Sequence, residues 1–355
     1  MKLFSTLVQD PTQQTCYYHP GLGTMEPAGA LTTFTRALTK VLGMAIGYGL
    51  ESDVRDAYVF IMRNYELGDR LYMFGFSRGA YTVRAVASLL HMYGLILPGN
   101  ESLVPYAIRL MLGIQRSSGK NNQVESYFQL ARQFKAILSV ECKPFFVGAW
   151  DTVSSVGWVE NPLHLPYTAN NPDIQIGRHA VAIDERRAFF RTNLWHTSGD
   201  AALAGPRDVK QVWFAGVHCD VGGGYAEQES GLSKIALHWM LAEAEFNGLL
   251  VNKRRKSEVL GADANTSYVV ENALAAPHES LKGWWRIAEF IPKRHYDWKT
   301  GRETRRMNLF RRRTIPAGSL VHESVFNRGA VYRQRIPSDA VSVATLQVAT
   351  GIKLE

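Results

Sequence analysis

The chain has 355 residues, 46% of them hydrophobic and 20% charged, with a formal charge of +8, the composition of a globular protein with ample material for a core. No run reaches the ~18 apolar residues that a membrane-spanning helix needs, and the first residues turn polar too soon for a secretory signal peptide. Three widely spaced cysteines indicate a reducing compartment and no disulfide framework. We therefore expect a protein that is cytoplasmic when made, unless it is exported by a route that reads no N-terminal signal peptide.

The N-terminal part of the chain carries three local signals. Residues 15–18 are typical of a short strand, and a Pro-Gly-x-Gly loop follows over residues 20–23, at the expected mouth of the active site. Residues 28–49 are mixed small and apolar, which favours a helix. From Ser52, a residue that can cap a helix, apolar side chains recur at helical spacing until Gly68.

The most informative stretch is residues 70–80. A short apolar run ends at Gly75, and a small-residue helical pattern begins at Arg78. Between them lies the Gly-x-Ser-x-Gly pattern of a nucleophile elbow, which holds a serine in a strained strand-to-helix turn. We expect larger residues at 75 and 79 to clash in this turn. The pattern predicts Ser77 as the nucleophile and the backbone N–H of Arg78 as an oxyanion donor.

The middle of the chain alternates helical and strand patterns. Helices are expected over 101–115 and 123–138, a buried strand over 144–150, a Pro/Asn-rich loop over 158–176 and a helix over 178–190. A further buried strand covers 209–216 and leads into a glycine-rich turn after His218. An amphipathic helix follows over 232–247, with Gly248 as its stop.

Strands that alternate with helices predict an α/β fold with a doubly wound, mostly parallel sheet. We expect one domain over residues 1–355, in which residues 250–330 form an irregular basic and aromatic covering of an α/β-hydrolase core. No internal repeat is present.

Three of the expected strands each end in a chemically useful residue. Ser77, Asp151 and His218 follow them in the order serine, acid, histidine, which is the chain order of α/β-hydrolase triads. The carboxyl ends of parallel strands share one edge of a sheet, so these side chains are expected to meet there. The roles are nucleophile for Ser77, proton carrier for His218 and orienting carboxylate for Asp151. Two substitutes remain open, His322 for His218 and Asp220 for Asp151.

The same residues could in principle serve other chemistries. His218, Asp220 and Asp151 are possible ligands of a divalent ion, but a hydrolytic metal centre would not need the serine elbow. Residues 222–224 are three glycines that could hold a phosphate, yet no Lys-Ser/Thr follows them as in a P-loop. We therefore expect no metal and no cofactor.

Residues 293–313 carry a local excess of positive charge, with nine Lys/Arg against Asp297 and Glu303. Apolar residues are interleaved with them, which is typical of a segment that contacts anionic lipid headgroups at a membrane surface. The alternatives are a solvated surface or a segment that binds nucleic acid or a protein partner, and we expect no nucleic acid.

Several of these motifs together resemble a known family. They are similar to motifs of the uncharacterised α/β-hydrolase family that includes the first branch of type VI secretion lipase effectors. The similar motifs are residues 17–24, 75–81, 150–153, 211–225 and 322–325. The similarity extends from about residue 14 to 328. It implies an α/β-hydrolase fold, phospholipase activity against bacterial membranes, and the serine, aspartate and histidine roles for Ser77, Asp151 and His218. For effector members it also implies delivery by a secretion spike protein and neutralisation by a cognate immunity protein.

One feature of the family pattern is missing. Family members open with a strand that leads to an Asp-Gly-Thr motif, which this chain lacks, so an edge or oxyanion element is in question. The predicted function is a serine esterase of the phospholipase A type acting on glycerophospholipids. The alternatives are a generic soluble esterase and a non-catalytic binding module that keeps the hydrolase fold.

Overall fold

A computed structural model gives the structure of the chain. It describes residues 1–20, 34–116, 121–153, 157–158, 161–162, 165–196, 205–263, 265–297 and 302–346. The Pro-Gly-x-Gly loop predicted over 20–23 lies almost wholly outside the described residues, as does the middle of the basic segment.

The central element is a six-stranded sheet with the order β1-β4-β7-β8-β11-β12, in which each pair of neighbours is parallel. The strands are β1 (Leu71–Phe76), β4 (Pro144–Trp150), β7 (Ile176–Ala182), β8 (Asp208–Phe214), β11 (Leu320–His322) and β12 (Val341–Val343). Among these strands the spatial order follows the chain order without a reversal. The α/β class and the parallel sheet are thus confirmed, but the reversal of strand order that defines a doubly wound sheet is not present in the described part of the chain.

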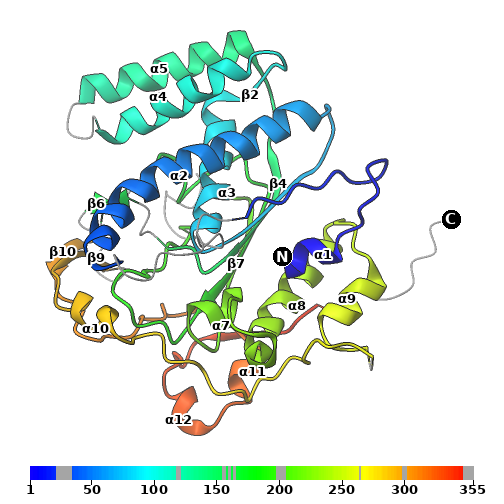
Figure 1. The fold of residues 1–355 in the computed structure, drawn as a ribbon, viewed down its shortest axis with the longest axis vertical. Helices are drawn as coiled ribbons and strands as arrows, with labels where there is room; N and C mark the ends of the chain where they lie inside the picture. The colour runs from blue at the N-terminus through cyan, green and yellow to red at the C-terminus, as the bar shows by residue number, and fades with distance from the viewer. Residues whose placement is uncertain are drawn as a thin grey trace.

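Side chains that alternate along the strands pack into two separate hydrophobic cores, one on each face of the sheet. Met73 and Val147 belong to the core under α2 (Phe34–Asn64), α3 (Arg78–Tyr93), α4 (Val104–Arg116) and α5 (Asn121–Leu138). Phe74 and Phe146 face the other core, which is built mainly on α8 (Gly231–Phe246). Figure 1 shows α2, α4 and α5 together on one side of the sheet and α8 on the other. This period-2 alternation is what a strand covered on both faces requires.

Two glycines end the helices that the sequence predicted them to end. Gly94 follows α3 with φ +68° and donates its N–H to the carbonyl of Leu90 at 2.9 Å, and Gly248 follows α8 with φ +96°. Both conformations are left-handed, where a Cβ is strained, so glycine is the natural C-terminal stop.

Three sequence predictions about secondary structure are wrong. Residues 178–190 begin inside β7 and are not a helix, because pairing with β4 and β8 and burial on both faces outweigh their local helix preference. Residues 15–18 form no strand. Ser52 lies within α2 and hydrogen-bonds to Asp56 at 3.4 Å, so it caps no helix.

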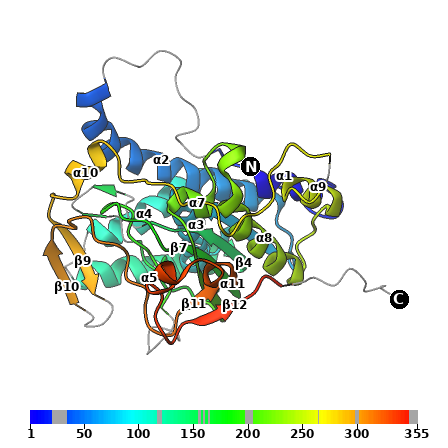
Figure 2. The same cartoon turned by 90° about the horizontal axis from the view of Figure 1, so that it is seen from below.

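The C-terminal third consists of short elements. It holds α9 (Lys253–Val259), α10 (Trp284–Ala288), a hairpin of β9 (Lys293–Asp297) and β10 (Arg302–Arg306), α11 (Glu323–Phe326) and α12 (Ala330–Arg333). Residues 320–322 add β11 to the central sheet, so this part of the predicted covering segment belongs to the core. Figure 2 shows α10 and the β9–β10 hairpin at one end of the molecule and α9, with α1 (Lys2–Thr6), at the other.

The remaining short strands are β2 (Leu95–Ile96) with β3 (Ser139–Val140), and β5 (Gly157–Trp158) with β6 (Asn161–Pro162). Among the described helices, none has both the length and the apolar character to cross a bilayer.

Candidate active site

Ser77 lies in the sharp turn between β1 and α3. Its φ of 58° and ψ of −119° are rare for a residue with a side chain, and such a conformation costs about 1–3 kcal/mol. The Ser77 N–H donates to the carbonyl of Trp150 at 3.0 Å, which ties the turn to the end of β4. Ser77 as a residue is half-buried.

The two glycines beside Ser77 differ in what they allow. A Cβ at Gly75 would lie 2.2 Å from the carbonyl oxygen of Gly79, so only glycine fits there. A Cβ at Gly79 would meet no atom within 4 Å. The prediction that a side chain clashes in this turn is therefore confirmed at 75 and wrong at 79.

His218 joins Ser77 to Asp151. Its Nε2 lies 2.7 Å from the Ser77 Oγ, and its Nδ1 lies 2.6 Å from the Asp151 Oδ2. His218 begins the short helix α7 (His218–Gly222) just after β8, and Asp151 directly follows β4. Since β1, β4 and β8 are parallel, their carboxyl ends share one edge of the sheet, and this edge brings together residues as far as 141 positions apart.

Asp151 is completely buried and accepts hydrogen bonds from three directions. Besides His218, the backbone N–H of Ala182 donates to its Oδ1 at 2.9 Å, and the guanidinium of Arg313 contacts both carboxylate oxygens at 2.6 and 3.0 Å. Burial alone would raise the pKa of this carboxyl, but Arg313 and His218 outweigh it and hold the pKa well below its usual range. Asp151 is therefore ionised at neutral pH.

Aromatic rings enclose the imidazole of His218. The ring of Phe76 lies 4.5 Å from it and the ring of Phe190 4.8 Å, the latter edge-on. A Cβ at Gly222 would lie 2.0 Å from the Phe76 ring, so the glycine-rich turn lets the chain pass close to this ring. The packing leaves the imidazole little freedom to rotate away from Ser77.

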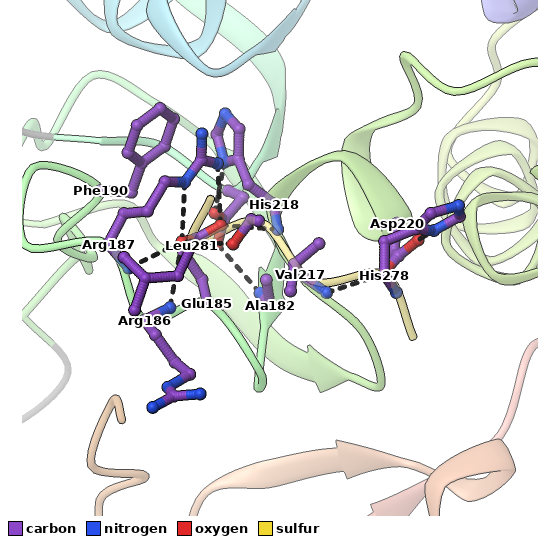
Figure 3. Close-up of polar contacts among 12 residues, drawn as sticks. Ala182, Glu185, Arg186, Arg187, Phe190, Val217, His218, Asp220, His278 and Leu281 are labelled. Carbon is purple, nitrogen blue, oxygen red and sulfur yellow. Dashed lines mark hydrogen bonds and ion pairs between the residues drawn. The ribbon is translucent and has the colours of Figure 1, made fainter. Parts of the chain in front are cut away.

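A second buried carboxylate, Glu185, supports the turn that presents His218. Its oxygens accept the backbone N–H of His218 at 3.2 Å, both ends of the Arg187 guanidinium at 2.9 Å and the hydroxyl of Ser280 at 3.0 Å. Burial would raise the pKa of Glu185, yet Arg187 and Arg313 lower it to about 2. Figure 3 shows Glu185, Arg187 and Phe190 on one side of His218.

The two substitute triad residues have other partners. The ring nitrogens of His322 lie 2.8 Å from the Ser324 hydroxyl and 3.0 Å from the Thr345 hydroxyl, and burial lowers its pKa to about 4. Asp220 accepts the N–H of Val217 at 3.0 Å and lies 2.6 Å from Nδ1 of His278, on the other side of His218 in Figure 3. Neither residue takes part in the hydrogen bonds that connect Ser77, His218 and Asp151.

The possible metal ligands do not converge. His218 and Asp151 bond to each other, whereas Asp220 bonds to His278. In the part of the chain that the structure describes, no group of three or more His, Cys, Asp or Glu side chains has the geometry to hold a metal ion.

Arg78 is the first residue of α3, directly after Ser77, so its N–H belongs to the N-terminal end of a helix. Its role as an oxyanion donor stays a prediction.

Sequence reasoning missed Arg313 and Glu185. In the sequence Arg313 is one charge in a basic segment, and nothing local marks its contact with Asp151, 162 positions away. The sequence signal for Glu185 is its place shortly after an apolar run whose pattern favours a helix.

The fold and the site define an α/β protein with a hydrogen-bonded serine, histidine and aspartate at the carboxyl edge of its parallel sheet. A family model described as "T6SS, Phospholipase effector Tle1-like, catalytic domain" matches residues 1–243. The chain therefore belongs to this family of type VI secretion phospholipase effectors, as its motifs predicted.

The chain is also similar to the uncharacterized protein YEL023C of Saccharomyces cerevisiae, with 35% identity over 199 residues. The match covers 54% of this chain and 29% of the yeast protein, so the chain corresponds to under a third of that relative. No solved structure matches the chain significantly.

Proposed function

We propose that this protein is a serine esterase that cleaves carboxylic ester bonds of glycerophospholipids. The observation that carries the proposal is the hydrogen-bonded line from a half-buried, strained Ser77 through His218 to an ionised Asp151, in a chain of a phospholipase effector family. The strained turn is then a nucleophile elbow and the fold an α/β-hydrolase.

The proposed reaction follows from the order of the three groups. The Ser77 Oγ attacks the ester carbonyl while His218 Nε2 takes its proton, and the N–H of Arg78 donates to the oxyanion. His218 then gives the proton to the departing alcohol, leaving an acyl-enzyme on Ser77. A water molecule, deprotonated by His218, attacks the acyl-enzyme, and Ser77 recovers its proton as the fatty acid leaves. Asp151 holds the imidazole tautomer and stabilises its charged form throughout.

The substrate class is tested with vesicles of phosphatidylglycerol or phosphatidylethanolamine. We expect the protein to release fatty acid from these vesicles, because the family acts on phospholipids. The measurement is titration of released fatty acid, beside hydrolysis of a short soluble ester. Hydrolysis of the soluble ester alone would reduce the protein to a generic esterase, and hydrolysis of neither would favour a non-catalytic binding module.

We further propose that the protein docks on anionic bilayers through what we call the apolar–basic surface. It comprises exposed residues of α10, of the end of β10 and of the two segments that follow these elements, namely Ile287, Phe290, Ile291, Arg305, Arg306, Met307, Leu309, Arg311 and Arg312. Exposed apolar side chains interspersed with arginines can bind at the boundary between the anionic headgroups and the acyl chains of a bilayer. The surface adjoins the site, because Trp285 of α10 packs 5.4 Å from Phe190, whose ring contacts His218.

Exchange of one exposed isoleucine tests this docking. Ile287→Ser should weaken binding to phosphatidylglycerol vesicles by roughly tenfold, the effect of losing one partly buried aliphatic side chain, with hydrolysis of a soluble ester unchanged. The measurement is vesicle sedimentation at low salt. The matched control is Ile137→Ser, which replaces an exposed isoleucine on α5. Equal binding by the two variants would refute the docking surface.

Membership of the effector family also supports a proposal about delivery and neutralisation of the protein. As a member of an effector family the protein would be made in the cytoplasm, delivered into a target cell by a secretion spike protein and neutralised by a cognate immunity protein.

A further inference from the structure

Arg313 reaches the site from outside the part of the chain that matches the family model. It follows the β9–β10 hairpin, in the segment that the sequence predicted to be a surface covering, yet its side chain is only 8% exposed. The matched residues end at 243, so the family model does not include it. A buried arginine in a basic surface segment needs a specific partner, because a desolvated charge is costly.

The guanidinium of Arg313 makes a full set of contacts around Asp151. Nη1 donates to Asp151 Oδ1 at 2.6 Å and to the carbonyl of Ala182 at 2.9 Å. Nη2 donates to Asp151 Oδ2 at 3.0 Å and to the carbonyl of Phe190 at 2.5 Å, which also accepts from Nε at 3.2 Å. The planar fork of an arginine fits both carboxylate oxygens at once, which a lysine cannot do.

Asp151 and Arg313 have opposite electrostatic effects on the imidazole of His218. The carboxylate attracts the Nδ1 proton of His218, whereas the guanidinium offsets part of the carboxylate charge that would stabilise an imidazolium. Arg313 thus allows a completely buried carboxylate to stay ionised, and it also limits how tightly His218 holds a second proton.

The same guanidinium anchors the wall of the imidazole pocket. Phe190 lies edge-on against the His218 ring, and its carbonyl accepts two of the Arg313 hydrogen bonds. Arg313 therefore links the carboxylate and the aromatic ring that together fix the imidazole.

We propose that Arg313 is a positioning residue whose positive charge, which its fork holds against Asp151, sets the pH range in which His218 acts as a base. The inference rests on the proposed esterase function. Without the guanidinium, the carboxylate charge stabilises the protonated imidazole more strongly, so a higher pH is needed to free the base.

The other charged or titratable groups around this pair are not themselves substituted in an Arg313 variant. They are Glu185 with its partner Arg187, Asp220 with His278, the buried His179 and the Cys219 thiol. Burial lowers the pKa of His179 to about 3 and raises that of Cys219, so both are neutral near pH 7. A shift in the pH profile of an Arg313 variant is therefore assigned to Arg313.

The test compares Arg313→Met and Arg313→Lys with the wild type over a pH series. In Arg313→Met, the acid limb of kcat/KM for a soluble ester should move to higher pH by roughly one to two units. Arg313→Lys keeps the charge without the fork, so its acid limb should stay near that of the wild type while kcat falls. The control is Arg254→Met, which removes an arginine that is 87% exposed and pairs with Glu258, and whose profile should not change.

An NMR measurement separates this inference from the esterase proposal. The downfield signal of the His218 Nδ1 proton, followed against pH, should change at higher pH in Arg313→Met, and it requires no substrate. If the wild type hydrolyses no ester, the proposed function fails, and this titration still decides the role of Arg313. Lower thermal stability of an Arg313 variant with an unchanged pH profile and an unchanged Nδ1 titration would make Arg313 a purely structural residue. If Arg313→Met does not fold, an Arg313→Lys profile that moves as far as one unit would likewise contradict the electrostatic role.

Discussion

Ser77→Ala is expected to lower kcat for ester hydrolysis by roughly 10⁶-fold, the loss seen when the nucleophile of a serine hydrolase is removed. Ser77 is half-buried and its neutral hydroxyl lies 2.7 Å from His218 Nε2, so its removal leaves no buried charge unpaired. The fold should persist, because the Ser77 N–H still donates to Trp150. The measurement is kcat on a soluble ester, with the melting temperature as a check on folding.

A second serine variant is the control for this loss of activity. Ser102→Ala removes an exposed hydroxyl just before α4 and should leave kcat unchanged. A Ser77→Ala protein that keeps more than a small fraction of wild-type activity would show that another group is the nucleophile.

His218→Ala should cost about as much as Ser77→Ala, and the double variant no more than either one, because the residues of a triad act as a unit. Without the imidazole no group lies at hydrogen-bond distance from the Ser77 Oγ to take its proton, among the contacts that the described residues make. Rates on soluble ester and on vesicles should fall together. Costs that simply add in the double variant would contradict a shared proton path.

His322→Ala is the control for the base. His322 lies against the hydroxyls of Ser324 and Thr345 and stacks on Phe214 at 4.8 Å, so its loss should lower the melting temperature and leave kcat nearly intact. The reverse pattern, with kcat lost in His322→Ala and kept in His218→Ala, would make His322 the base.

The positions of Ser77, Asp151 and His218 were predictable because their placement depends on a simple geometric rule. Each follows an apolar run of strand character, and parallel strands end at one edge of the sheet. The rule requires no knowledge of the loops. It therefore held although the strand order of the described sheet differs from that of a doubly wound fold.

The groups that surround Ser77, Asp151 and His218 were not predictable in the same way. Arg313 and Glu185 contact Asp151 and His218 only after distant segments have packed, and a charged residue in a basic or helical pattern looks like a surface residue. Local preference also misled the prediction for residues 178–190, where β7 forms because both of its faces are covered.

In the described sheet, β1 lies at one edge, so the strand that carries Ser77 is paired on one side only, with β4. The proposed mechanism takes its oxyanion donor from the first residue of α3, Arg78.

The most direct test of the account is reaction with a fluorophosphonate, which forms a covalent adduct only with an activated serine. Mass spectrometry of the labelled wild-type protein should place the adduct on Ser77, with no adduct on Ser77→Ala. An unlabelled wild type, or an adduct on a different serine, would contradict the proposal that Ser77, His218 and Asp151 pass a proton along one line.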